Sequence, residues 1–191
     1  DKKFEFQFHK NRIIINRPKL NGLHQIENAS VALAFREVMI QKGYLMNLKK
    51  TNKAIKETSW PGRLEIIYYK NKTVILDGSH NIDAEKKLNQ FLKIKRIKPV
   101  VLFGMLNNKK IYDFLKIIKN QINSILAIKI PNEKNAFLAT EIGDKCNLLS
   151  VKYLKIKNIK EALNHIENMD HKVFLITGSL YLVGKIRTIF L

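Results

Sequence analysis

The spacing of apolar residues changes character part-way along the chain. Phenylalanines alternate with polar residues over 4–8 and an isoleucine run follows at 13–15, a pattern that predicts a hairpin of two strands. Apolar residues then recur at helical spacing over 20–43, and a second, short helix is expected over 51–57. Gly43 stands where the end of a helix favours a residue that can take positive φ.

From residue 64 onward, short aliphatic runs alternate with amphipathic helices. The expected strands cover 64–69, 73–77, 99–103, 124–130, 149–153 and 172–177, and the expected helices cover 82–94, 111–122, 137–145, 159–169 and 180–190. This alternation predicts right-handed crossovers and an α/β fold with a mostly parallel sheet flanked by helices. Between the two patterns, Pro61 blocks helix continuation and Gly62 frees the backbone. We therefore expect two domains, 1–57 and 58–191.

Composition narrows the class of protein. No apolar run approaches the roughly 20 residues of a membrane helix, and the start of the chain does not have the pattern of a signal peptide. The single cysteine, Cys146, excludes an internal disulfide and is expected to be a small buried side chain rather than a catalytic thiol. The five histidines show no metal-ligand spacing. These observations predict a cytoplasmic protein without a metal site of its own.

The formal net charge of +19 is compatible with a basic module that binds nucleic acid. The charge, however, is mostly lysine scattered along the whole chain, whereas the arginines that read bases and phosphates in pairs of hydrogen bonds are few. The pattern therefore argues against a nucleic-acid partner, although it keeps that function as an alternative of another class.

Glycine and polar residues follow three of the expected strands. They occupy 77–81 (DGSHN), 104–108 (GMLNN) and 177–179 (TGS). Each turn alone could be an ordinary connection between a strand and a helix. The carboxyl ends of parallel strands, however, share one edge of the sheet, where α/β proteins bind ligands. Arg63 has the planar fork that suits phosphate, with a salt bridge to Glu65 as the competing interpretation. The chain has no G-x-x-x-x-G-K-[ST] phosphate loop and no G-x-G-x-x-G element.

Four motifs in order carry a resemblance to a known family. They are LNGLHQIENASVAL at 20–33, WPGRLE at 60–65, DGSHN at 77–81 and TGSLYLVG at 177–184. They resemble folylpolyglutamate synthase and bifunctional dihydrofolate synthase, ATP-dependent ligases of the Mur ligase superfamily. The resemblance covers essentially the whole chain but only the carboxyl-terminal part of the family. It implies a Rossmann-like C-terminal Mur-ligase domain preceded by the tail of the central ATPase domain, and a missing N-terminal domain that carries the phosphate loop and the magnesium ligands.

The resemblance also implies roles for particular residues. Asn28 resembles the asparagine that contacts adenine, although polar residues in an opening helical turn, here with His24 and Gln25, can also be simple caps. Arg63 resembles the arginine that reaches the ATP phosphates, and Asp77 the aspartate that contacts the nucleotide. His80 and Ser179 resemble residues near the incoming glutamate, and Arg63 and His80 are the expected catalytic pair.

The implied reaction uses ATP, Mg²⁺, L-glutamate and a folate or dihydropteroate, and proceeds through an acyl phosphate. Without the phosphate loop, the chain is expected to be inactive alone. A Mur ligase acting on a peptidoglycan precursor is the related alternative. The chain departs from the family in two places. Where the family usually has G-x-L-x-D-K-D, residues Gly104–Lys110 keep the lysine and lose both acids. After Pro131, an arginine that is common in the family is not evident among residues 132–135.

Overall fold

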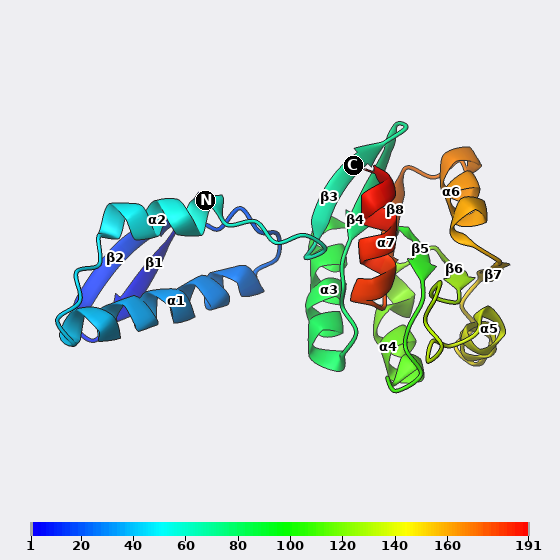
Figure 1. Cartoon of the computed structure of the whole chain (residues 1–191), viewed down its shortest axis with the longest axis horizontal. Coiled ribbons are helices and arrows are strands. Elements are labelled where there is room, and N and C mark those ends of the chain that lie inside the picture. The colour runs from blue at the N-terminus through cyan, green and yellow to red at the C-terminus, as the bar shows by residue number, and fades with distance from the viewer. Residues whose placement is uncertain (1, 191) are drawn as a thin grey trace. The chain divides into compact units, whose positions relative to one another are not determined.

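The structure is a computed structural model that describes residues 2–190 (Figure 1). The chain divides into two compact units, unit 1 over Asp1–Trp60 and unit 2 over Pro61–Leu191. The boundary expected from the sequence, between residues 57 and 58, lies just before this division. Each unit has its own hydrophobic core.

Unit 1 consists of a β-hairpin covered by two helices. Strands β1 (Lys3–Phe8) and β2 (Asn11–Asn16) pair antiparallel, and they are followed by α1 (His24–Gln41) and α2 (Leu48–Glu57). The small core is formed by Phe6, Ile15, Ala29, Leu33 and Ile55. The predicted hairpin and helices are confirmed, and Gly43 takes a φ of 88° just after α1, as expected. Helix α1 begins at His24, four residues later than the expected start at residue 20.

Unit 2 is built on a six-stranded sheet. Its strands are β3 (Glu65–Tyr69), β4 (Lys72–Leu76), β5 (Val100–Phe103), β6 (Ser124–Ile128), β7 (Tyr153–Ile156) and β8 (Val173–Thr177), in the spatial order β3-β4-β8-β5-β6-β7. Only β3 runs antiparallel to its neighbour. The prediction of a mostly parallel sheet is therefore confirmed.

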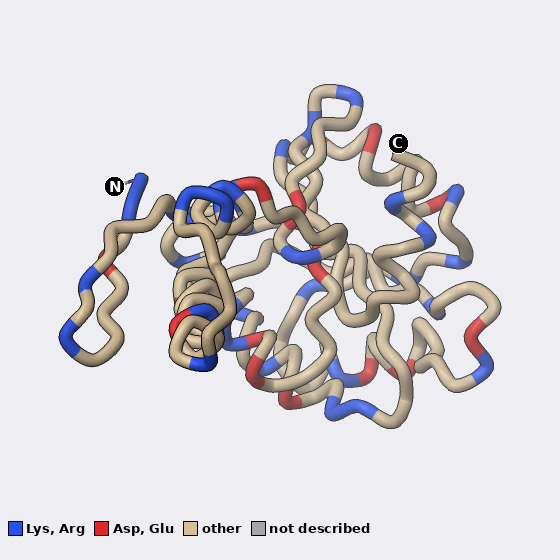
Figure 2. The backbone as a smooth tube through the Cα atoms, turned by 60° about the vertical axis from the view of Figure 1, so that its left-hand side comes forward, with Lys and Arg blue, Asp and Glu red and all other residues tan. Residues whose placement is uncertain are grey.

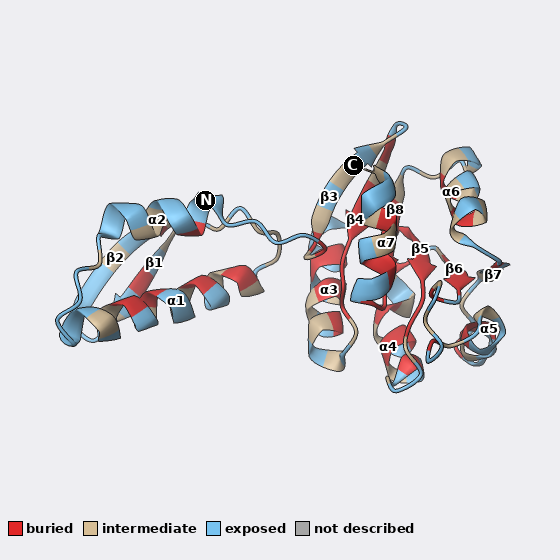
Figure 3. Ribbon diagram, in the orientation of Figure 1, coloured by how far each residue is buried: buried red, intermediate tan, exposed pale blue. Residues whose placement is uncertain are grey.

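Helices cover both faces of this sheet. One core cluster packs α3 (Ile82–Lys95), α4 (Ile111–Ile118) and α5 (Ala139–Leu148) on one face, and a second packs α6 (Ile159–Asn168) and α7 (Leu180–Phe190) on the other. The 3₁₀ turn Lys119–Gln121 follows α4. Figure 3 shows the central strands buried between these layers. The layers follow from the sequence, because strands that are buried on both faces need the continuous apolar runs seen at β4, β5, β6 and β8.

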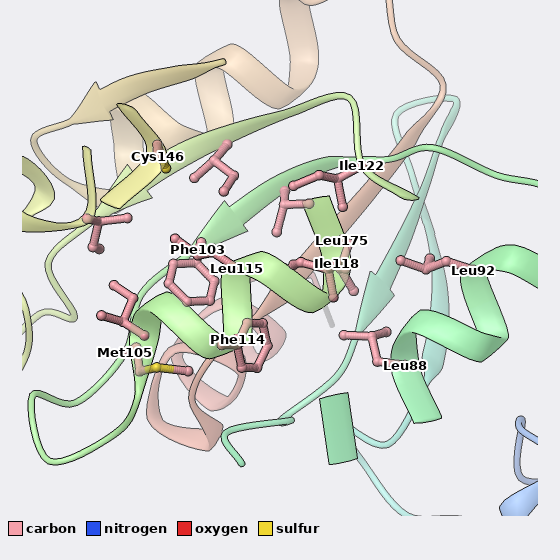
Figure 4. Packing of buried hydrophobic residues seen from close by; sticks show 14 of the residues in the cluster. Leu88, Leu92, Phe103, Met105, Phe114, Leu115, Ile118, Ile122, Cys146 and Leu175 are labelled. Carbon is pink, nitrogen blue, oxygen red and sulfur yellow. The ribbon is translucent and has the colours of Figure 1, made fainter. Parts of the chain in front are cut away.

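The α4 face contains two of the largest fully buried side chains of the unit. The rings of Phe103 and Phe114 lie 5.2 Å apart at their centroids, tilted by 48°, and Leu115 and Ile118 are completely buried beside them (Figure 4). Burying an aromatic or aliphatic side chain of this size stabilises a fold by about 1.5–3 kcal/mol. This packing holds α4, and with it the connection that leads from β5, against the sheet.

One strand prediction is wrong. A strand was expected over 149–153, but α5 continues to Leu148 and the strand β7 begins only at Tyr153. Leu149 is the C-cap of α5, and Ser150 takes a left-handed φ of 56°, which ends the helix without a glycine. The apolar residues of this stretch therefore serve the end of a helix first, and the turn displaces the strand towards the C-terminus.

Charged residues occur along both units. Lysine and arginine are spread over the whole backbone and are interspersed with acidic residues (Figure 2). In the part of the chain that the structure describes, no helix has the length and apolar character needed to cross a membrane.

The order of the strands creates a crevice. The parallel strands β4, β8 and β5 are neighbours, so their carboxyl ends lie side by side. The helices that follow β4 and β5 pack on one face of the sheet, whereas the helix that follows β8 packs on the other. Such a switch of direction opens a crevice at the edge of the sheet. The predicted convergence of 77–81, 104–108 and 177–179 at one edge is confirmed.

Candidate functional site

Asp77 connects the segment before β3 to the turn after β4. It is only 4% exposed. Its Oδ2 accepts a hydrogen bond from the Leu64 amide at 3.0 Å, and its Oδ1 accepts bonds from the Ser79 amide at 3.1 Å and from the Ser79 hydroxyl. Burial raises the pKa of Asp77, while these hydrogen bonds and the charge of Arg63 oppose the rise. The carboxylate therefore fixes the residue that follows Arg63.

Arg63 is held on its other side as well. The Gly62 carbonyl accepts a hydrogen bond from the Gly78 amide at 2.8 Å, and the Gly62 amide donates one to Glu65 Oε2 at 2.8 Å. The half-buried Arg63 thus lies between two fixed residues. The competing salt bridge with Glu65 is not formed, because Glu65 pairs with Arg187 Nε at 2.9 Å. Within residues 2–190, Arg63 has no ion-pair partner, which leaves its guanidinium available for an anion.

Glu65 binds both the Gly62 amide and the side chain of Arg187. Burial alone would raise the pKa of Glu65, but the hydrogen bonds from Arg187 and Gly62 and the charge of Arg187 hold the pKa below its usual value. The carboxylate is therefore ionised at neutral pH, and it links the joint before β3 to the last turn of α7.

Two glycines allow the strand ends to approach each other. A Cβ on Gly78 would overlap the side chain of Leu180 in the first turn of α7. Gly178 has a φ of 98°, and a Cβ there would lie 2.6 Å from the carbonyl oxygen of Gly104. The Gly178 amide also donates to the Ser79 carbonyl at 3.2 Å. The three turns are consequently in direct contact, and larger residues at these glycines would separate them.

His80 and Ser179, the residues expected near glutamate, both line one cavity in this crevice. The Nδ1 of His80 lies 2.8 Å from the Gly78 carbonyl, and since a carbonyl only accepts, Nδ1 carries the hydrogen. In the neutral ring this leaves Nε2 as an acceptor. Ser179 is 3% exposed, and its Oγ accepts a hydrogen bond from the Tyr181 amide at 3.1 Å, so that its hydroxyl hydrogen remains free to point elsewhere.

The crevice contains two neighbouring cavities. The α3 cavity, of about 320 Å³, is lined by residues 80–83 and 85 at the start of α3, residues 105 and 108–110 of the β5–α4 connection, and Phe114. The α7 cavity, of about 230 Å³, is lined by residues 80, 106, 108 and 109 and by 178–181 at the start of α7. His80, Asn108 and Lys109 belong to both cavities and form the wall that they share. Met105 and Phe114, on the α3 side, are also part of the core (Figure 4).

Two contributors to these cavities were not singled out as site residues from the sequence. The first is the pair of lysines that follows residues 104–108 in the β5–α4 connection, where Lys109 lines both cavities and Lys110 lines the α3 cavity. The second is Glu85, which is completely buried and whose two carboxylate oxygens have no hydrogen-bond partner among residues 2–190. A sequence signal for Glu85 exists, because it lies three residues after Ile82 and three before Leu88, on the apolar stripe of α3.

Asn28 belongs to unit 1, whereas the other expected site residues belong to unit 2. Its Nδ2 donates to Gln25 Oε1 at 3.0 Å, and Gln25 Nε2 lies 3.0 Å from His24 Nε2. The N-cap of α1 is Leu23, which has no side-chain cap hydrogen bond. The exposed Asn28 is oriented by the buried Gln25.

Cys146 has no part in the crevice. It is completely buried in the core on the α5 side of the sheet, and burial raises the pKa of its thiol to about 11. The prediction of a buried, structural cysteine is confirmed. In the described part of the chain, no three His, Cys, Asp or Glu side chains gather where they could hold a metal ion.

Comparison with models of protein families identifies the family to which this sequence belongs. The sequence model described as "Mur ligase, glutamate ligase domain" matches residues 62–180, which include all three turns of the crevice. The chain belongs to this family.

Curated relatives of this Mur ligase chain include dihydrofolate synthases and a folylpolyglutamate synthase. The chain is 25% identical over 176 residues to the dihydrofolate synthase/folylpolyglutamate synthase of Bacillus subtilis, which covers 90% of this chain and 40% of that protein. It is also 25% identical to the dihydrofolate synthetase of Saccharomyces cerevisiae, over 87% of this chain and 44% of that protein. The chain thus spans well under half the length of these relatives.

Solved structures agree on the fold. The folylpolyglutamate synthase of Thermotoga maritima superposes with a TM-score of 0.78 and 26% identity, over 98% of this chain and 43% of that one. E. coli FolC, solved in complex with DHPP and ADP, gives a TM-score of 0.82 at 19% identity, over 99% and 44%. A bifunctional folylpolyglutamate synthase/dihydrofolate synthase with Mn, AMPPNP and L-glutamate bound gives 0.79 at 18%, over 99% and 44%. The expected Rossmann-like Mur-ligase fold is confirmed.

Proposed function

We propose that this chain is the carboxyl-terminal part of an ATP-dependent ligase that adds L-glutamate to the carboxylate of a folate or dihydropteroate. The observation that carries the proposal is the α7 cavity at the ends of β4, β8 and β5, where His80, Lys109 and Ser179 surround a space of about 230 Å³. A cation, a histidine and a hydroxyl at a helix start fit the carboxylates of a small acidic amino acid.

Arg63 is the residue of this chain that fits the phosphates of ATP. Its guanidinium is unpaired within residues 2–190, and hydrogen bonds fix the backbone of Gly62 and Leu64 on both sides of it. Bound ATP would supply the phosphoryl group that activates the folate carboxylate as an acyl phosphate. Arg63 would hold the negative charge of that group without needing to reorganise, which is the efficient form of electrostatic catalysis.

Asp77 acts on the nucleotide site as a positioning residue in this proposal. Its two carboxylate oxygens already accept three hydrogen bonds from Leu64 and Ser79, and it is almost fully buried. A direct contact with the nucleotide would have to use the remaining acceptor capacity of these oxygens. Its larger effect is to fix the backbone next to Arg63 and to supply a neighbouring negative charge.

His80, Ser179 and Lys109 would position the amino acid for attack on the acyl phosphate. The Nδ1–H of His80 is bonded to Gly78, so Nε2 is the atom that can accept a proton or hydrogen bond from a ligand. The Ser179 hydroxyl and the Lys109 ammonium donate to carboxylate oxygens. Holding the amine close to the acyl carbon lowers the barrier through orientation.

The remaining part of the catalytic site belongs to a partner region, the N-terminal ligase domain. We assign 1–57 to the end of the central ATP-binding domain and 58–191 to the glutamate-binding domain, so that Asn28 contacts the adenine. Mg²⁺ does not fit the described residues, since no acidic cluster is present among them.

Helix α1 has an exposed apolar face. Val31 and Phe35 are 71% and 61% exposed and lie one helical turn apart. This face is suited to be covered by the rest of the central ATP-binding domain.

The proposal is tested with the complete gene product and with the 191-residue chain. The complete protein is expected to consume ATP and add L-glutamate to dihydropteroate or tetrahydrofolate, and to leave muramyl nucleotides unchanged. Arg63→Ala should reduce kcat by about 100-fold or more, whereas Arg12→Ala, at an exposed pair in unit 1, should leave it unchanged. The 191-residue chain alone should show no folate-dependent ATP turnover. Glutamate addition to muramyl nucleotides, or an unchanged rate in Arg63→Ala, would contradict the proposal.

A further inference from the structure

The α3 cavity contains a group for which the proposed reaction gives no use. Glu85 has a relative exposure of 0%, and neither of its carboxylate oxygens has a hydrogen-bond partner among the described residues. The side-chain carbonyl of Asn89, one turn further along α3, is unpartnered as well. Buried polar atoms are satisfied in the great majority of cases, so three unpaired acceptors on one helix face indicate a missing donor.

The charges around Glu85 identify the kind of donor. Burial, together with the like charge of Asp113 on α4, raises the pKa of Glu85 to about 9. The other charged or titratable groups of the cavity are His80, Asp83, Lys109 and Lys110. None of them makes an ion pair or hydrogen bond with Glu85. A buried carboxyl without a cation is costly in its charged form, and a cation placed beside it would remove that cost.

The other side of the α3 cavity has the opposite charge. Lys109 and Lys110 line it, and neither forms an ion pair within residues 2–190. The cavity therefore presents two ammonium groups at the β5–α4 connection and one buried carboxyl on α3. The complementary ligand is a small zwitterion that carries one ammonium group and one or two carboxylates, which is the chemistry of an acidic amino acid.

We propose that the α3 cavity binds the ammonium group of the amino-acid substrate and that Glu85 is the residue that receives it. The inference rests on the proposed function for the identity of the ligand, and it adds to that function an anchor for the amine. Lys109 stands in the wall shared with the α7 cavity, so an amino acid can place its carboxylates at Lys109 and its ammonium on the α3 side. Asp83 is exposed, and its solvated charge makes it a weaker partner.

The pairing has a measurable signature. Unliganded Glu85 is mostly protonated at neutral pH, since its pKa is about 9. Forming an ion pair requires the carboxylate, so binding of the ammonium releases a proton from Glu85. The apparent affinity then rises by about tenfold per pH unit while the pH stays below the pKa.

The test is a titration of the 191-residue chain with L-glutamate, followed by NMR and by calorimetry in buffers of different ionisation enthalpy at pH 6, 7 and 8. Glu85→Gln keeps the shape of the side chain but cannot ionise, and Glu57→Gln, at an exposed residue of unit 1, is the matched control. Glutarate, which has both carboxylates and no ammonium group, is the control ligand. Circular dichroism verifies that each variant is folded.

The wild-type chain and Glu57→Gln should bind L-glutamate with proton release and with an affinity that increases from pH 6 to pH 8. Glu85→Gln should bind L-glutamate at least about tenfold more weakly, without proton release and with no preference over glutarate. The inference is overturned if Glu85→Gln binds like the wild type, if Asp83→Asn alone removes the preference for L-glutamate, or if the wild-type chain shows no binding up to about 10 mM. Failure of the complete protein to modify folates would refute the proposed function and leave this binding result unaffected.

Discussion

The carboxylate of Asp77 accepts a hydrogen bond from the backbone amide of Leu64 at 3.0 Å, across a separation of 13 residues. Leu64 has a φ of 47°, an uncommon value for a residue with a side chain, and it is 2% exposed. The joint that presents Arg63 is therefore held in an unusual backbone conformation by a buried carboxylate.

Removing this carboxylate should destabilise unit 2. In Asp77→Ala, the amides of Leu64 and Ser79 and the Ser79 hydroxyl lose their acceptor, and unsatisfied buried donors cost about 1–3 kcal/mol each. We expect a loss of at least about 3 kcal/mol of unfolding free energy in urea titrations. Asp83→Ala, an exposed acid in the first turn of α3, should cost less than about 1 kcal/mol. Equal losses in the two variants would show that Asp77 does not hold the joint.

The close approach of Gly78 to α7 predicts a rescue experiment. A methyl group at residue 78 would overlap Leu180, so Gly78→Ala should lower the unfolding free energy by about 1–3 kcal/mol. Leu180 is 44% exposed, and Leu180→Ala alone should have a small effect. The double variant Gly78→Ala/Leu180→Ala should recover most of the loss, measured as a coupling energy in a double-mutant cycle. Additive losses would contradict the contact.

The unpaired carboxyl of Glu85 predicts a pH dependence of stability. Its folded pKa of about 9 lies above the ordinary value of 4.5, so the folded state binds more protons between these values. The stability associated with Glu85 is therefore complete below pH 4.5 and falls as the pH rises towards 9. Glu85→Gln should remove this fall, so that its unfolding free energy in chemical denaturation exceeds that of the wild type most strongly near pH 9. Parallel pH profiles for the two proteins would contradict the assignment.

The single cysteine provides a probe of unit 2. Because Cys146 is completely buried and its thiol pKa is raised to about 11, native protein should react with an aromatic disulfide reagent only through opening of the structure. We expect labelling to be slow without denaturant and to accelerate in proportion to the opened fraction as urea is added. With one cysteine in 191 residues, the signal has one source. Rapid labelling of the native protein would contradict the buried position.

Local patterns were sufficient to predict the helices and strands, apart from the start of β7, and to predict that the three turns share one edge of the sheet. The apolar runs of β4, β5 and β8 and the polar residues that follow them place His80 and Ser179 correctly in one crevice. Asn81 was part of the motif from the start, and the structure shows that its side chain caps α3 by accepting from the Ala84 amide at 2.9 Å.

The three failures have different physical causes. Glu65 appeared to be a neighbour for Arg63, but its partner Arg187 lies 122 residues further along the chain, and no local pattern contains that information. The start of β7 was misplaced because the turn at Ser150 uses a left-handed conformation without glycine. Glu85 was overlooked because a glutamate in a helix is usually solvated, and only its place on the apolar stripe indicates burial.

The contacts of Glu65 have a topological consequence. Its carboxylate touches the Gly62 amide near the beginning of unit 2 and the Arg187 guanidinium in the last turn of α7, at 2.8 and 2.9 Å. The first and last elements of the unit are thereby brought to one place, as they are in proteins that tolerate circular permutation. A short linker could join these two ends, and new termini could be opened in the exposed turn at Lys70–Asn71. The crevice at the ends of β4, β8 and β5 could in this way be formed by a chain whose segments follow one another in a different order.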